Sequence, residues 1–246
     1  MIPRIYWAQP LYVGLRLEPD AEVRRYLLRT LRLSPGATVT LFNGQEEGEW
    51  RATLIHPAPL QIEVSAFVHR HSDSLLPITL VQGVAKADAM EWVVQKSVEL
   101  GVQRIIPLVC RRSSSNAGGD LNANRMRRLR RIAVEATEQC GRVRLPEITD
   151  PASWAELAQI VFPGPRWLFW EGDATVPCWR TMTLGREPLT ILVGPEGGLE
   201  QQEVQLARER LGFASYSLGP RILRTETAAI AAIALCQTLF GDMGRE

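Results

Sequence analysis

Lysine is almost absent from this sequence of 246 residues. The chain has 28 basic residues, and since only Lys86 and Lys96 are lysine, the other 26 are arginine. Arginine suits bidentate contacts with phosphate, but a general coding bias is the simpler explanation for most of these residues. The 27 acidic residues leave a formal net charge of +1, so the overall charge indicates no class of partner.

Cysteine and histidine are too few and too scattered for the common metal and redox sites. The four cysteines, Cys110, Cys140, Cys178 and Cys236, form no CxxC pair. Their spacing argues against a zinc site and favours reduced thiols in the cytoplasm. The three histidines all precede residue 72. We therefore expect no bound metal, and no histidine-based catalytic triad in the rest of the chain.

Familiar nucleotide-binding and membrane-spanning segments are missing as well. The chain has no GxxxxGK[ST] and no HExxH, and no GxGxxG follows a strand, which argues against a P-loop and an ordinary dinucleotide site. Pro3 and Arg4 replace the apolar start of a signal peptide, so we expect none. The longest apolar run, residues 228–236, is too short to span a bilayer and predicts a buried helix.

Residues 1–72 have the pattern of a small β-rich domain. Asn43-Gly44 lies between two apolar runs and predicts a hairpin. A short helix is expected over residues 21–31, and the polar stretch 69–74 is expected to be a linker. Strands at this spacing favour a small barrel. The predicted strands cover residues 2–7, 38–42, 50–56 and 60–68.

Residues 73–246 alternate between strand-like and helix-like segments, which predicts an α/β domain with a mostly parallel sheet. One helix is expected to begin at Asp88 with a capping box at Glu91, and another at Ser153 with Glu156. The predicted strands cover residues 76–83, 104–109, 167–170, 189–193 and 213–218. The further predicted helices cover residues 122–140, 200–211 and 225–240.

Two glycine–proline turns follow predicted strands near the end of the chain. They are Gly194-Pro195 and Gly219-Pro220, 25 positions apart (219 minus 194). Open parallel sheets bind ligands at the carboxyl edge of their strands, so the two turns can flank one pocket. Thr225 is expected to cap the last helix, and Glu226 to lie in its first turn.

Charged residues on the helix predicted over 122–140 form two further candidate sites. Glu135 and Glu138 lie near its carboxyl end, where the helix dipole disfavours acids, and this favours a functional role. Residues 125–131 contain five arginines, which form either a solvated helix face or a phosphate-binding patch.

Together these segments resemble the SPOUT methyltransferases, and most closely the RsmE family, which methylates N3 of uridine 1498 in 16S ribosomal RNA. The similar segments are residues 192–199, 218–228, 90–102, 138–148, 2–6 and 41–44. The resemblance implies a PUA-like RNA-binding barrel over residues 1–72 and a deep trefoil knot over residues 73–246. It also implies S-adenosylmethionine as cofactor, the small ribosomal subunit as partner, and a homodimer formed through the knot domain.

The resemblance also implies roles for individual residues. Arg224, or less favourably Arg142, stabilises negative charge on the uracil, and Glu138, Glu226 or water removes the N3 proton. Glu196 binds a ribose hydroxyl or only caps Gly197-Gly198. The candidate cofactor residues are Leu168, Trp170, Leu192, Gly194, Pro195, Glu196, Gly197, Leu218, Gly219, Ile222, Leu223, Thr225 and Ala228. The candidate RNA-binding residues are Arg4, Arg29, Arg127, Arg128 and Arg221.

Two alternatives stay open at this point. One is another knotted RNA methyltransferase, acting on a ribose 2′-hydroxyl or on guanine. The other is an RNA-binding ribosome-assembly factor without catalytic activity, which the presence of Gly194, Gly197 and Arg224 disfavours.

Overall fold

The computed structural model describes residues 2–113, 121–170, 172, 183–185 and 187–244. The chain forms two units. One consists of Met1–Asp73 with Thr137–Leu145, and the other of Ser74–Ala136 with Pro146–Glu246. The segment Thr137–Leu145, which begins in the last turn of the helix predicted over residues 122–140, therefore groups with the N-terminal residues. Cys178 lies outside the described residues.

The first unit contains a five-stranded sheet in the order β1-β3-β4-β5-β2. β1 pairs with β3 in parallel, and the other neighbours are antiparallel. The four predicted strands are confirmed, whereas β2, with two residues, was too short to carry a pattern. The strands are β1 Arg4–Tyr6, β2 Arg16–Leu17, β3 Thr38–Phe42, β4 Gly48–Pro57 and β5 Leu60–His69.

Local sequence explains the turns of this unit. Asn43 Oδ1 accepts the amide of Gln45 at 3.0 Å and Gly44 has φ +76°, which together form the predicted hairpin turn between β3 and β4. Helix α1, Ala21–Arg25, continues as a π-helical turn, η1, over Tyr26–Thr30, so the predicted helix is present.

The second unit contains a six-stranded sheet in the order β11-β9-β10-β6-β7-β8, and every neighbouring pair is parallel. This confirms the predicted α/β domain with a mostly parallel sheet. The strand β8 was not predicted. The strands are β6 Ile78–Gly83, β7 Arg104–Leu108, β8 Glu147–Ile148, β9 Arg166–Phe169, β10 Leu189–Val193 and β11 Ala214–Tyr216.

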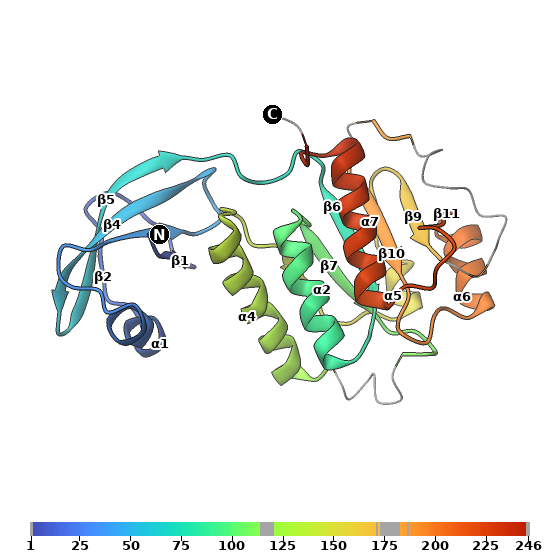
Figure 1. Ribbon diagram of the computed structural model, residues 1–246, viewed down its shortest axis with the longest axis horizontal. Helices are drawn as coiled ribbons and strands as arrows, with labels where there is room; N and C mark the ends of the chain where they lie inside the picture. The colour runs from blue at the N-terminus through green and yellow to red at the C-terminus, as the bar shows by residue number, and fades with distance from the viewer. Residues whose placement is uncertain (1, 114–120, 171, 173–182, 186, 245–246) are drawn as a thin grey trace. The chain divides into compact units, whose positions relative to one another are not determined.

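Helices cover both faces of this sheet. Helices α2 and α7 lie side by side in front of it (Figure 1). Apolar side chains of α5 and α6, including Leu157 and Val204, pack into one core with Val81 and Leu192 of the sheet. The helices are α2 Ala87–Glu99, α4 Ala123–Cys140, α5 Trp154–Leu157, α6 Gln201–Gln205 with its π-helical continuation η3 Leu206–Arg210, and α7 Thr225–Phe240.

Capping boxes were predicted at the N-termini of two helices, and one of the two is present. Ser153 and Glu156 form the predicted capping box of α5. The prediction for α2 was wrong, because the helix begins at Ala87, and Lys86 at its N-cap makes no side-chain cap. Asp88 therefore lies inside the first turn, and Glu91 forms an ion pair with Arg128 instead.

Candidate active site

The carboxyl end of β10 lies at the centre of the parallel sheet, between β6 and β9. Val193 pairs with Gln82 of β6 and with Phe169 of β9. All five β10 residues are buried, so the chain first becomes partly exposed at Gly194. This is the sheet edge at which backbone groups can meet a ligand.

Residues 194–199, the first loop, are in backbone contact with the end of β6. A Cβ atom on Gly83 would lie 2.4 Å from the Pro195 nitrogen and 2.7 Å from the Gly194 carbonyl carbon. No side chain fits at such distances, so glycine at position 83 is what lets the loop sit directly on the strand.

The remainder of the first loop is tied to two other segments. The Arg112 guanidinium donates to the Gly197 carbonyl at 3.5 Å, and a Cβ on Gly197 would lie 2.8 Å from the Arg112 carbonyl oxygen. Glu196 Oε1 accepts a hydrogen bond from the Lys86 amide at 3.3 Å. The Gly198 amide donates to the Pro195 carbonyl and not to the Glu196 side chain. Glu196 thus contacts the start of α2, and its role toward a ribose stays a prediction.

Residues 217–224, the second loop, contrast with the first because their contacts are few and local. Ser217 Oγ accepts the Gly219 amide at 3.1 Å and donates to the Gly219 carbonyl at 3.2 Å. Gly219 has φ +115°, and a Cβ there would meet nothing within 4 Å. Ile222 is 84% exposed, and Arg221 is exposed as well. The second loop therefore presents bare backbone and an apolar side chain to solvent.

Thr225 links the two loops. The prediction that it caps α7 was wrong, because Arg224 is the N-cap residue and Thr225 is the first helical residue. Its Oγ1 donates to the Gly194 carbonyl at 2.6 Å, and Thr225 is only 5% exposed. The start of α7 is therefore held on the turn that follows β10.

Sequence reasoning missed Gln82, the penultimate residue of β6. It is fully buried, and its amide nitrogen lies 2.8 Å from Thr225 Oγ1 and 3.4 Å from the Gly194 carbonyl oxygen. The Gln82 Oε1 atom has no hydrogen-bond partner among the described residues. The available signal was one polar residue inside the otherwise apolar run 80–84.

The remaining predicted cofactor residues divide into core and edge positions. Leu168 and Leu192 are fully buried in the core, so only their backbone can reach a ligand. Trp170 is partly buried, and its amide donates to the Tyr216 carbonyl at 3.2 Å. Leu218 and Leu223 in the second loop and Ala228 in α7 are partly exposed.

The four predicted catalytic residues belong to different units. Arg224 is exposed, and its side chain makes no hydrogen bond or ion pair with any residue that the structure describes. Glu226 lies in the first turn of α7, two residues further. Glu138 and Arg142 belong to the first unit, by the division given above.

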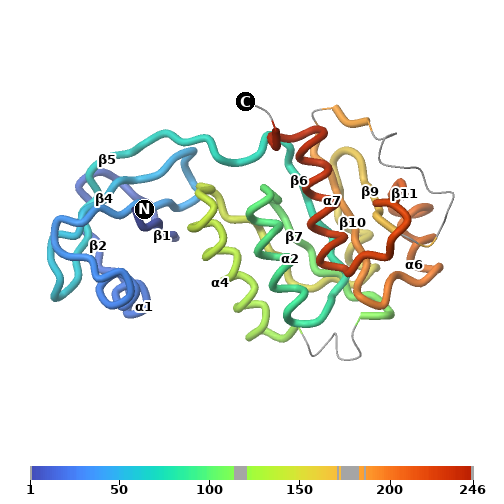
Figure 2. The backbone as a smooth tube through the Cα atoms, viewed as in Figure 1, coloured from blue at the N-terminus to red at the C-terminus, as the bar shows by residue number. Residues whose placement is uncertain are grey.

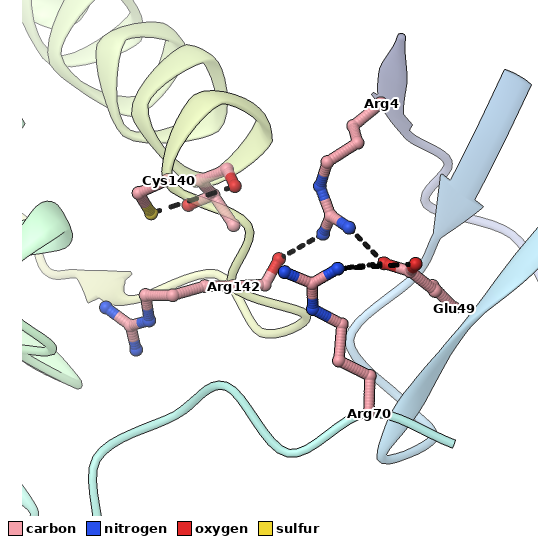
Figure 3. Close-up of polar contacts among 6 residues, drawn as sticks. Arg4, Glu49, Arg70, Cys140 and Arg142 are labelled. Atoms are coloured by element: carbon pink, nitrogen blue, oxygen red, sulfur yellow. Dashed lines mark hydrogen bonds and ion pairs between the residues drawn. The ribbon is translucent and has the colours of Figure 1, made fainter. Parts of the chain in front are cut away.

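Glu138 and Arg142 are held within the first unit by polar contacts. Figure 3 shows the Arg142 carbonyl beside the Arg4 side chain, which also reaches Glu49. Arg142 is 4% exposed, its guanidinium donates to Asp73 at 2.6 Å, and its carbonyl accepts Arg4 at 2.7 Å. Arg4 also pairs with Glu49, and Glu138 Oε1 accepts the Tyr6 amide at 2.9 Å. These contacts hold the segment 137–145, while the roles of Arg4 in RNA binding and of Glu138 and Arg142 in catalysis stay predictions.

The arginines of α4 differ in their pairing. Arg128 pairs with Glu91, Arg130 with Asp150 and Arg131 with Glu135. Hydrogen bonds from Arg128 hold the pKa of Glu91 below its usual range. Arg127 hydrogen-bonds only to Asn124, among the described side chains. Arg29 is exposed at the end of η1.

A groove of about 850 Å³ lies between α2 and α4. Its walls carry acids and bases in equal number together with the exposed side chain of Trp92. The lining residues are Asp88, Glu91, Trp92, Gln95, Arg127, Arg128, Arg131, Ile132 and Glu135.

In the part of the chain that the structure describes, no helix is long and apolar enough to cross a bilayer. Likewise, no three acidic, cysteine or histidine side chains of the described ranges gather closely enough to hold a metal ion. Burial raises the pKa of the Cys236 thiol to about 12 and also raises that of Cys110.

Known proteins resemble this chain over most of its length. Residues 72–237, which include both loops, match the model of the RNA methyltransferase domain. The chain belongs to this RNA methyltransferase family. A ribosomal RNA small subunit methyltransferase E of Buchnera aphidicola is 31% identical, across 98% of this chain and 95% of the relative.

Solved structures of the family have the same fold. A putative methyltransferase of Legionella pneumophila, solved with the bound cofactor SAM, aligns with a TM-score of 0.90 and 32% identity, covering 98% of this chain and 99% of that one. A ribosomal RNA small subunit methyltransferase E of Neisseria gonorrhoeae, bound to S-adenosyl methionine, aligns with a TM-score of 0.87 and 33% identity over the same shares.

Proposed function

We propose that this protein is an S-adenosylmethionine-dependent methyltransferase that methylates N3 of uridine 1498 in 16S ribosomal RNA. One observation carries the proposal: Thr225 joins the two glycine–proline loops at the edge of a parallel sheet, in a chain of this methyltransferase family. The similar Legionella and Neisseria structures contain this cofactor, and the Buchnera relative is named for ribosomal RNA of the small subunit.

The two loops fit the proposed cofactor. Its adenosyl group needs backbone donors and acceptors beside an apolar surface. Gly219 offers backbone with open space around it, and Ile222 offers an exposed apolar side chain. The backbone of Leu192 and Gly194 is the proposed opposite wall. The Leu192 side chain is buried in the core, and a Cβ on Gly194 would point at Leu199, so both residues can offer only backbone to the cofactor.

Bound S-adenosylmethionine supplies a methyl group on a sulfonium sulfur. In the proposed reaction uracil N3 would bond to the methyl carbon, and the electron pair of the broken carbon–sulfur bond would stay on sulfur. The N3 proton must leave, and negative charge develops on the uracil oxygens. The protein therefore mainly aligns the base with the methyl group and stabilises this charge.

Arg224 and Glu226 are the catalytic residues that we propose beside the loops. The Arg224 guanidinium is exposed and has no carboxylate partner among the described residues, so it is available to the uracil oxygens. Glu226 is the carboxylate proposed to take the N3 proton, because it shares the second unit with both loops. Glu138 already accepts the Tyr6 amide.

The finer architecture and setting belong to the same proposal. We infer that residues 1–72 form a PUA-like RNA-binding barrel and residues 73–246 a deep trefoil knot. We also propose, from the resemblance to the RsmE family, a homodimer through the knot domain and action in the cytoplasm. The five-stranded sheet of the first unit supports the barrel, and the parallel sheet with its two linked loops supports the knot.

Arg224→Ala tests the catalytic assignment. We expect methyl transfer to small ribosomal subunits to fall by about a hundredfold or more, as for removal of one group that stabilises transition-state charge. Calorimetric affinity for S-adenosylmethionine should stay within a few-fold of the wild type. The control is Arg208→Ala, which removes another exposed arginine of the second unit. Unchanged turnover in Arg224→Ala would remove this residue from the mechanism.

A further inference from the structure

Gln82 occupies a position that neither strand formation nor core packing explains. It lies near the end of β6, among apolar residues, and is fully buried. Burying an amide side chain is costly unless hydrogen bonds compensate. Its side-chain nitrogen contacts the carbonyl of the next residue, Gly83, but its other two contacts leave the strand and run to the first loop and to the first residue of α7.

The contacts form a relay of hydrogen bonds. The Gln82 amide donates to Thr225 Oγ1 at 2.8 Å, and that hydroxyl donates to the Gly194 carbonyl at 2.6 Å. The Gln82 amide nitrogen also lies 3.0 Å from the Gly83 carbonyl oxygen. Since a hydroxyl that accepts one hydrogen bond donates a stronger one, the relay holds more firmly than its separate links.

We propose that Gln82 is a positioning residue, which holds the two cofactor loops in the binding conformation before the cofactor arrives. Thr225 is the second member of this relay. The inference rests on the proposed function, because it assumes that the loops bind S-adenosylmethionine. A preordered site loses less entropy on binding, so the relay raises affinity without touching the ligand.

The second loop has few contacts of its own that could fix its position relative to the first loop. It has mainly local hydrogen bonds, and the segment from Gly219 to Ile222 is exposed. Its downstream end enters α7 at Thr225, the second member of the relay. Fixing Thr225 on Gly194 therefore sets the distance between the end of the second loop and the first loop.

The test uses two near-isosteric substitutions in the full-length protein. Gln82→Met removes the amide donor, and Thr225→Val removes the hydroxyl. We expect each to weaken calorimetric binding of S-adenosylmethionine by about tenfold. The double variant should bind only slightly more weakly than either single variant, because both break the same relay. Thr225→Ser keeps a hydroxyl and should bind within about twofold of the wild type.

Gln237→Met is the matched control. Gln237 is likewise fully buried, accepts Ser74 Oγ at 2.7 Å and donates to the Leu100 carbonyl at 2.8 Å. It lies near the other end of α7 and touches neither loop. We expect it to lower the melting temperature as Gln82→Met does, with cofactor affinity unchanged.

Hydrogen exchange of the ligand-free protein gives a second measurement. Amides of residues 194–199 and 217–226 should exchange faster in Gln82→Met and Thr225→Val, but not in Gln237→Met. The inference is overturned if exchange and affinity match the wild type, or if Gln237→Met weakens binding equally. If the wild type itself binds no S-adenosylmethionine, the proposed function fails instead.

Discussion

The two glycine–proline loops are built in opposite ways. The first loop is held by backbone contact with Gly83, by Arg112 and by the hydroxyl of Thr225. The second loop has open space at Gly219 and an Ile222 side chain that is 84% exposed. The first loop is therefore closely packed against its neighbours, whereas the second loop exposes backbone and an apolar side chain. Figure 2 shows the chain entering α7 directly from the second loop.

Of the substitutions in the two loops and on α4, we expect the largest loss of cofactor affinity from disrupting the packing of the first loop on β6. In Gly83→Ala, the new Cβ would lie 2.4 Å from the Pro195 nitrogen, so the first loop must move away from β6. We expect a loss of about 1–3 kcal/mol in the free energy of unfolding, as for overpacked cores. Calorimetric affinity for S-adenosylmethionine should fall by at least about tenfold, which is about 1.4 kcal/mol. An unchanged affinity would show that the first loop is no part of the site.

A smaller loss of cofactor affinity is expected from Gly219→Ala in the exposed second loop. The new methyl group meets no neighbour, but φ +115° is strained for alanine, which costs about 1–3 kcal/mol. Relaxing that strain changes the loop path, so cofactor affinity should fall several-fold. Gly36→Ala is the control, because Gly36 has φ +87° and equally open surroundings in the first unit. It should lose similar stability and no affinity, and equal affinity losses would contradict the comparison.

The smallest expected effect, on RNA affinity, concerns a similar contrast on α4, between an ion-paired arginine and one with no ion pair in the described part of the chain. Arg130 is paired with Asp150, whereas Arg127 has no carboxylate partner among the described residues. We expect Arg127→Ala to weaken RNA binding modestly and to lower the slope of log affinity against log salt by about 1. Arg130→Ala should change neither. Equal slopes in a filter-binding titration would make α4 a solvated face rather than an RNA-binding surface.

Periodic features of the fold could be predicted from the sequence. Strands 38–42 and 189–193 were predicted at their observed bounds, because at least four of the five residues in each are buried and a turn signal, Asn43-Gly44 or Gly194-Pro195, follows directly. The two-residue strands β2 and β8 could not be predicted, because they are too short to show a period. Their existence depends on neighbouring strands that the local sequence does not reveal.

The candidate site was predictable only in part, for a similar reason. Glycine–proline pairs after apolar runs indicate loops at a sheet edge, but they do not say what holds the loops. Thr225 was expected to serve its own helix, whereas its hydroxyl serves Gly194, 31 residues away. Gln82 was missed because its partners lie up to 143 residues away in sequence. Hydrogen bonds between distant segments leave no periodic pattern.

The most direct test of the central claim is a methyl-transfer assay with product analysis. Purified protein, isotopically labelled S-adenosylmethionine and small ribosomal subunits from a strain lacking this gene would be incubated together. The ribosomal RNA would then be digested and its nucleosides identified by mass spectrometry. We predict label in 3-methyluridine, and in the fragment that contains uridine 1498. Label in a 2′-O-methylated nucleoside or a methylguanosine, or cofactor binding with no transfer at all, would contradict the claim.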